Sequence, residues 1–113
     1  MFKDFPTLKI LVSHGGGAIP YHWARFEASS LRRGGERFSD KMRNLYYDTV
    51  LYSSDSLALL IKTVGADRLI FGTDSPMMLA LKKRGRDLID QVELNPADKA
   101  KVLGGTAKML LKL

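Results

Sequence analysis

Two short segments of the sequence combine side chains that could do chemistry with residues that shape the backbone beside them. In the first, His14 is followed by three glycines, Gly15, Gly16 and Gly17. An imidazole can accept or deliver a proton near neutral pH. Glycines admit positive φ angles and leave N–H groups unshielded, so we expect Gly15 and Gly16 to bind a substrate carboxylate or a developing oxyanion. The alternative is a tight turn whose histidine only makes a hydrogen bond.

The second segment, residues 72–76, places Asp74 shortly before Pro76. An aspartate can be an oxygen ligand of a metal ion or a general base, and it can equally form an Asx turn before a proline. His14 and Asp74 each follow an apolar stretch that is typical of a buried strand. If those strands are parallel, both side chains emerge at one edge of the sheet, and the sequence predicts a catalytic pair there.

Three further polar side chains are candidates for this site. His22 and Arg25 lie in the helix expected after the glycines. A guanidinium can bind a substrate carboxylate through two hydrogen bonds, and His22 could contact the same substrate. The alternatives are a solvated arginine and a packed or capping histidine. Asp48, near another strand end, either acts at the site or ties down the neighbouring loop.

The elements that must position these residues alternate between strand and helix along the chain. We expect strands at residues 7–13, 45–49 and 68–72, and helices at 19–31, 96–103 and 106–111. A further helix, capped by Ser54 or Asp55, is expected from the helical spacing of Leu57, Leu60, Ile61 and Val64, and it ends at Gly65. This alternation is typical of parallel strands joined by right-handed crossovers, and it predicts one α/β domain over residues 1–113.

The predicted helices cover only one face of a three-stranded sheet, whereas parallel sheets are normally covered on both faces. We expect Leu8, Ile10 and Val12 to line the uncovered face. An apolar face of this kind is unstable in water, so the sequence predicts that the chain self-associates into a homo-oligomer.

Composition excludes several classes of protein. With 45% hydrophobic and 27% charged residues, the chain has the composition of a globular protein and lacks an apolar run long enough for a transmembrane helix. The first residues do not resemble a signal peptide, so we expect a cytoplasmic protein. The absence of cysteine excludes disulfides, thiolate metal sites and a cysteine nucleophile. No Gly-x-Ser-x-Gly string accompanies the His-Gly-Gly-Gly run, which argues against an α/β-hydrolase esterase.

The net charge of +6 raises the question of a nucleic-acid partner. The basic clusters are short, Arg32-Arg33 and Lys82-Lys83-Arg84, and acidic residues dilute them. No nucleic-acid-binding motif is present. We therefore expect neither a nucleic-acid nor a membrane partner, and a solvated basic face that could steer an anionic substrate.

Taken together, a series of short motifs resembles the amidohydrolase-2 family. That family includes aminocarboxymuconate-semialdehyde decarboxylase, related aromatic-acid decarboxylases and oxalomesaconate hydratase. The motifs are, in order, Asp4-Phe5-Pro6-Thr7-Leu8-Lys9, Ser13-His14-Gly15-Gly16-Gly17 with Pro20-Tyr21 and Arg25, Tyr47-Asp48-Thr49, Gly65-Ala66-Asp67-Arg68, and Phe71-Gly72-Thr73-Asp74-Ser75-Pro76.

The resemblance implies a partial (β/α)8 TIM barrel, of which this chain would be the three C-terminal βα units. It also implies roles for individual residues: Asp74 matches a metal-ligating aspartate, His14 a histidine that activates metal-bound water, and Arg25 an arginine that grips a substrate carboxylate. The implied cofactor is Zn²⁺. The implied reaction is decarboxylation or hydration of a small unsaturated or aromatic carboxylic acid, with hydrolysis as a third alternative.

The chain departs from the family at the metal site. Family members carry a His-x-His pair on the first strand and a further histidine on the fifth, whereas the only histidines here are His14 and His22. A catalytic zinc site usually has three protein ligands, so we expect this chain alone to bind Zn²⁺ weakly. The competing hypothesis is a catalytically inactive truncated barrel fragment that folds by self-association.

Overall fold

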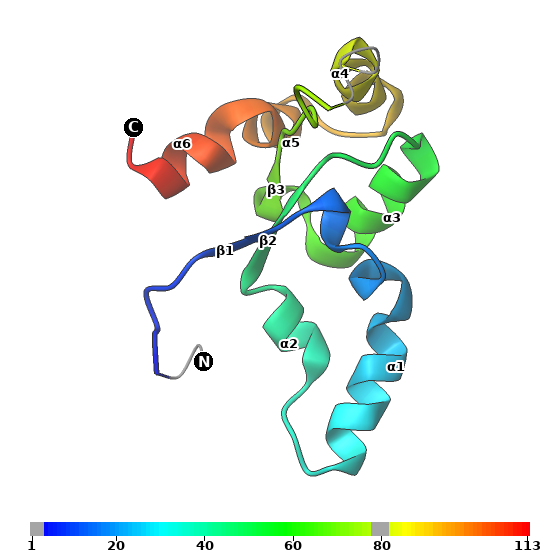
Figure 1. Ribbon diagram of the computed structural model, residues 1–113, viewed down its shortest axis with the longest axis vertical. Helices are drawn as coiled ribbons and strands as arrows, with labels where there is room; N and C mark the ends of the chain where they lie inside the picture. The colour runs from blue at the N-terminus through cyan, green and yellow to red at the C-terminus, as the bar shows by residue number, and fades with distance from the viewer. Residues whose placement is uncertain (1–3, 78–81) are drawn as a thin grey trace.

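Three parallel strands form the centre of the molecule in a computed structural model that describes residues 4–77 and 82–113 (Figure 1). The strands are β1 (Ile10–Val12), β2 (Leu45–Asp48) and β3 (Leu69–Ile70), in the order β1-β2-β3. Both neighbouring pairs are parallel, which confirms the predicted α/β topology. Each strand is shorter than the apolar stretch that predicted it.

The helices begin and end at residues suited to those positions. Pro20 occupies the first turn of α1, where a missing N–H costs nothing. The Ser53 hydroxyl caps α3 by accepting from the Ser56 amide, so the cap is neither Ser54 nor Asp55, as predicted, but the residue before them. Asn95 caps α5 in the same way. The helices are α1 (Ile19–Arg32), α2 (Phe38–Met42), α3 (Ser54–Val64), α4 (Lys82–Gln91), α5 (Pro96–Ala100) and α6 (Thr106–Leu111), with short helical turns η1 (His14–Gly16), η2 (Ala66–Arg68) and η4 (Lys101–Gly105).

Two helices, α2 and α4, were not predicted. The five residues of α2 are too few to show a helical period. In α4, Leu88 and Ile89 are adjacent apolar residues within a charged segment, and both are buried in the core. Two neighbouring apolar residues give no recurring spacing, which is why the sequence alone did not indicate this helix.

The core lies between the sheet and the helices that cover one face of it. Tyr47 of β2 is fully buried there, in a cluster with Leu57 and Leu60 of α3, Leu69 of β3 and Val102 of η4. The Tyr47 hydroxyl donates to the Met42 carbonyl oxygen at 3.0 Å, and burial raises the pKa of Tyr47 to about 12. The central strand is therefore anchored by an aromatic side chain with a satisfied polar end.

The uncovered face of the sheet is not the one that the sequence predicted. Val12 packs against the core beside its register partner Tyr47, whereas Leu11 is 53% exposed. Because side chains alternate between faces along β1, the assignment of Ile10 and Val12 to the open face was wrong, and Leu11 lies there instead. Leu8 precedes β1 and is 39% exposed. The two-residue repeat of a strand divides its side chains between two faces. It does not show which of the two faces the helices cover.

Among residues 4–77 and 82–113, no helix is both long and apolar enough to cross a bilayer.

Candidate active site

The loops that follow the three strands meet at one edge of the sheet. Because the strands are parallel, their carboxyl ends point the same way. His14 follows the end of β1 by two residues, Asp48 is the last residue of β2, and Asp74 follows β3 by four. His14 and Asp74 therefore lie on loops at the same edge, as a shared site requires.

Three non-glycine residues at this edge adopt positive φ angles, which a side chain disfavours. His14, Tyr52 and Asp74 have φ angles of 52°, 55° and 55°, one in each loop after a strand. A positive φ costs a non-glycine residue about 1–3 kcal/mol, and residues held this way concentrate at functional sites. Three such residues at one edge favour a site there.

Asp48 fastens the glycine turn to the end of β2. Its Oδ1 accepts hydrogen bonds from the Gly15 amide at 3.0 Å and from the Val50 amide at 3.1 Å. This is the loop-tying role that the sequence left open for Asp48. The turn can approach so closely because it lacks side chains: a Cβ on Gly15 would lie 2.7 Å from a Leu51 methyl carbon, and one on Gly16 would lie 2.7 Å from the Tyr47 ring.

The glycine amides already have acceptors within the chain. The Gly15 amide donates to Asp48, and the Gly16 amide donates to the Ser13 carbonyl oxygen at 2.9 Å. The substrate-binding role predicted for Gly15 and Gly16 assumed free N–H groups, and the structure gives both groups partners. In the structure, these two glycines allow the turn to pack closely against β2.

Asp74 is held by a residue that sequence reasoning missed. The Tyr52 hydroxyl donates to Asp74 Oδ2 at 3.2 Å, and Asp74 is half-buried. Burial raises the pKa of Tyr52, followed by the hydrogen bond to Asp74 and the negative charges of Asp74 and Asp48. Tyr52 is therefore a protonated donor at neutral pH. The sequence feature that could have identified Tyr52 was its position in the loop after the second strand. That loop lies at the same edge of the sheet as the loop that carries Asp74.

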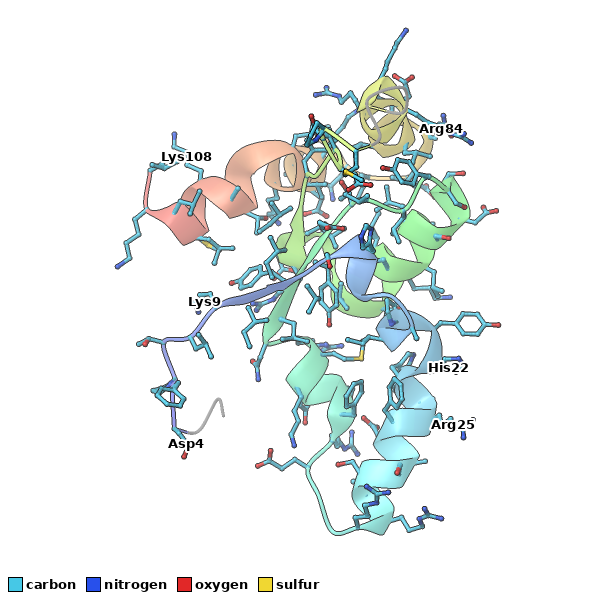
Figure 2. The ribbon with its side chains drawn as sticks, in the orientation of Figure 1. Asp4, Lys9, His22, Arg25, Arg84 and Lys108 are labelled. Atoms are coloured by element: carbon cyan, nitrogen blue, oxygen red, sulfur yellow. The ribbon has the colours of Figure 1, made fainter. Side chains whose placement is uncertain are left out.

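His22 and Arg25 are not brought to this edge. Both are exposed on α1, and Figure 2 shows their side chains on the side of the helix that faces away from the sheet. The His22 ring packs edge-on against Tyr21, with ring centroids 4.9 Å apart, and lies 6.3 Å from Phe26. This supports the packed-histidine alternative, and substrate binding by His22 and Arg25 stays a prediction.

The metal implied by the resemblance has too few ligands here. Within the described part of the chain, no three His, Cys, Asp or Glu side chains converge to hold a metal ion. Asp74 is the ligand that the family resemblance implies at the strand ends. The described residues do not by themselves fit a metal centre.

Comparison with known proteins gives a family match over the whole chain: a family model described as "Amidohydrolase" matches residues 1–113. The chain is 35% identical over 75 residues to 2-keto-4-carboxy-3-hexenedioate hydratase of Sphingobium sp., covering 66% of this chain and 22% of the relative. It is 25% identical to 2-amino-3-carboxymuconate-6-semialdehyde decarboxylase of Dictyostelium discoideum, covering 100% of this chain and 33% of the relative.

The fold is also similar to a solved structure. Dihydroxybenzoic acid decarboxylase from Polaromonas sp. JS666, described with bound manganese and the inhibitor 2-nitroresorcinol, superposes with a TM-score of 0.80 at 25% identity. The match covers 99% of this chain and 36% of that one. The chain thus spans roughly a fifth to a third of the curated relatives it matches.

Proposed function

The chain belongs to the amidohydrolase family, and from this premise we propose that residues 1–113 form one domain equivalent to the three C-terminal βα units of a (β/α)8 barrel. The complete barrel would decarboxylate or hydrate a small aromatic or unsaturated carboxylic acid. The observation that carries the proposal is that His14 and Asp74 follow parallel strands at one edge of the sheet. Barrel enzymes place their catalytic groups at that edge.

His14 is the proposed proton-transfer group. Decarboxylation replaces CO₂ on a carbon by a proton, and hydration adds the hydrogen and hydroxyl of water across a double bond. Both reactions need a side chain that delivers or removes a proton at carbon or water. His14 is exposed at the strand ends, so a substrate can reach its ring. In this proposal Asp74 is the second catalytic group.

The metal of the complete barrel is proposed to be Zn²⁺, with Mn²⁺ as the alternative suggested by the Polaromonas relative. Asp74 would supply one ligand, and the remaining ligands would come from outside the residues described here.

The second candidate function is a non-catalytic chain that self-associates. Two observations favour it: Leu11 on the uncovered sheet face is 53% exposed, and the described residues hold no three-ligand metal group. Covering that face would require a second copy of the chain or the rest of a barrel.

A chimeric enzyme tests the first proposal against the second. This chain would replace the matching 36% of the Polaromonas decarboxylase, and turnover of dihydroxybenzoate would be measured together with metal content. We expect measurable turnover, its loss in His14→Ala, and unchanged metal content in that variant. A matched control, Lys108→Gln on exposed α6, should keep the activity. A folded, metal-loaded chimera without turnover would contradict the enzyme proposal, and loss of metal in His14→Ala would make His14 a ligand instead.

A further inference from the structure

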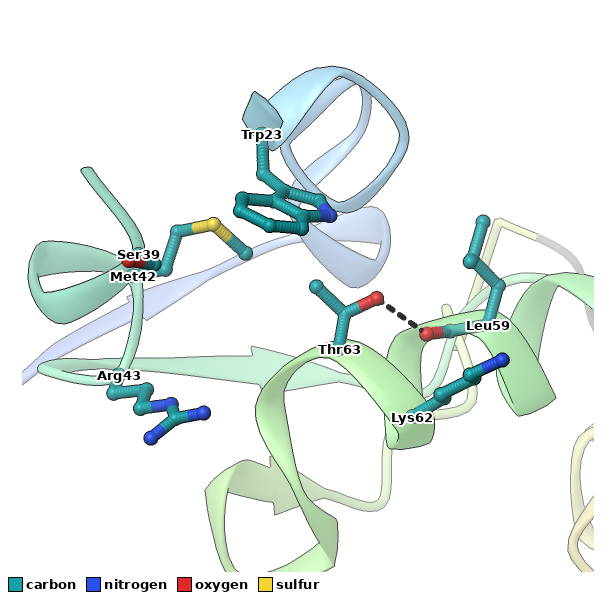
Figure 3. Close-up of a pocket in the computed structure, with 7 residues that line it drawn as sticks. All are labelled: Trp23, Ser39, Met42, Arg43, Leu59, Lys62 and Thr63. Atoms are coloured by element: carbon teal, nitrogen blue, oxygen red, sulfur yellow. Dashed lines mark hydrogen bonds between the residues drawn. The ribbon is translucent and has the colours of Figure 1, made fainter. Parts of the chain in front are cut away.

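A hollow lies between α1, α2 and α3, away from the candidate active site at the strand ends (Figure 3). Its volume is about 320 Å³, within the range of about 300–1,000 Å³ that is usual for small-molecule pockets. Arg43, which lines it, precedes the first residue of β2 by two positions. The hollow therefore reaches toward the amino ends of the strands, whereas His14 and Asp74 follow their carboxyl ends.

The apolar part of the lining comes from three elements. Trp23 of α1 is 37% exposed, Met42 of α2 is 2% exposed, and Leu59 of α3 is 41% exposed. Figure 3 shows the Trp23 indole ring between the side chains of Met42 and Thr63. A flat apolar ring could stack on or pack edge-on against the indole, which is a favourable arrangement for aromatic pairs.

The polar part of the lining is cationic. Arg43 and Lys62 are both exposed, and their side chains have no ion-pair or hydrogen-bond partner among the residues that the structure describes. The adjoining hollow shares both cations, and its one acidic lining residue, Asp67, lies 3.4 Å from the Arg68 guanidinium. An anion entering between Arg43 and Lys62 thus meets two unpaired positive charges.

The hydroxyl groups of the lining are already used. Thr63 Oγ1 donates to the Leu59 carbonyl oxygen at 2.7 Å. Ser39 donates its amide and its hydroxyl to the Glu27 carboxylate at 2.9 and 2.5 Å, and these hydrogen bonds lower the pKa of Glu27. Glu27 is therefore a charged carboxylate whose Oε2 is held by Ser39. Recognition in this hollow depends on the indole ring and the two cations.

We propose that this hollow is an accessory binding site for a small planar aromatic carboxylate. The ring packs against Trp23 and Met42, and the carboxylate lies between Arg43 and Lys62. The proposal does not depend on the strand-end chemistry, so either can fail without the other.

The single tryptophan of the chain makes the test direct, because Trp23 reports occupancy of its own pocket. Intrinsic fluorescence would be titrated with benzoate and with its uncharged counterpart benzamide. We expect saturable quenching by benzoate, and affinity for benzamide weaker by about threefold or more, as expected for loss of partly exposed charge pairs. Raising the ionic strength should weaken benzoate binding and leave benzamide unaffected.

Arg43→Gln and Lys62→Gln should each weaken benzoate binding by about threefold, and Lys108→Gln on α6 is the matched control. Far-UV circular dichroism checks that each variant is folded. If Arg43→Gln does not fold, Lys62→Gln still tests the proposal. Equal affinities for benzoate and benzamide, quenching that rises linearly without saturation, or an equal effect of Lys108→Gln would overturn the proposal.

Discussion

At the scale of single residues, the strand-end site depends on how each side chain is held. Asp74 has a positive φ and a hydrogen bond from Tyr52, while Asp48 accepts from two backbone amides. The Asp48 contact with Gly15 joins the loop after β1 to the end of β2, and the Tyr52 contact joins the loop after β2 to the loop after β3. A carboxylate positioned in this way loses little further freedom when it binds a ligand or a substrate.

Tyr52→Phe tests whether that hydrogen bond matters for function. In the chimeric enzyme we expect kcat to fall by about tenfold with little change in KM, because a partner that orients a site carboxylate typically contributes about 10-fold or more to activity. Tyr21→Phe is the control, since Tyr21 is 75% exposed on α1. Steady-state kinetics give both constants. An unchanged kcat in Tyr52→Phe would leave Tyr52 with a purely structural contact.

At the scale of elements, the turn between β1 and α1 is shaped by its fit against β2. Gly15 and Gly17 have nearly equal φ angles of 59° and 57°. A Cβ on Gly15 would lie 2.7 Å from a Leu51 methyl carbon, whereas a Cβ on Gly17 would meet nothing within 4 Å. Their ψ angles differ, 19° at Gly15 and −119° at Gly17, so of the two only Gly15 is in the left-handed helical conformation. Gly15 combines that conformation with a lack of space for a side chain.

Gly15→Ala, made in the parent and in a Leu51→Ala background, separates these two effects. In both backgrounds the substitution has the cost of about 1–2 kcal/mol for a left-handed alanine, and in the parent it adds about 1–3 kcal/mol of overpacking against Leu51. Urea denaturation of each variant measures the difference in free energy of unfolding. Equal losses of stability would mean that Leu51 moves aside without cost, and that the glycine turn tolerates a side chain.

The central strand predicts a dependence of stability on pH. The pKa of Tyr47 rises from 10.0 to about 12 on folding, so between these values the folded chain binds a proton that the unfolded chain has released. The free energy of unfolding therefore falls as pH rises through this interval, by up to about 1.4 kcal/mol per pH unit, and this group contributes no slope below it. Chemical denaturation at several pH values should show a shallower fall in Tyr47→Phe than in the parent; identical slopes would contradict this assignment.

At the scale of the whole molecule, the chain exposes apolar side chains that folded monomers usually cover. Leu11 lies on the uncovered face of the sheet, and Phe5 and Leu8 before β1 are 61% and 39% exposed. Burying such a surface against another chain or another part of a barrel is favourable in proportion to its apolar area. The matched segment makes up roughly a fifth to a third of the length of the relatives.

We expect the isolated chain to self-associate through that face. Sedimentation velocity should show a dimer or larger species, and Leu11→Glu should shift the distribution toward monomer. Leu31→Glu is the control, because Leu31 is 50% exposed near the end of α1, away from the sheet. A monomeric parent chain at all accessible concentrations, or equal effects of the two substitutions, would argue against an interface on the sheet.

The sequence by itself determined the alternation of strand and helix, the family, and the strand-end positions of His14 and Asp74. These features are local: apolar runs, glycines and prolines mark where strands end, and parallel topology then places the following residues at one edge. The helices α1 and α3 were predicted for the same reason, since their apolar spacing or their flanking Pro20 and Gly65 can be read along the chain.

The tertiary structure alone decided which side chains meet. The pairing of Tyr52 with Asp74 joins residues 22 positions apart, and that of Asp48 with Gly15 joins residues 33 apart. Neither contact can be predicted from a local periodicity in the sequence. It also decided that Val12 faces the core and Leu11 the open side, because alternation defines two faces and only packing against the helices chooses between them.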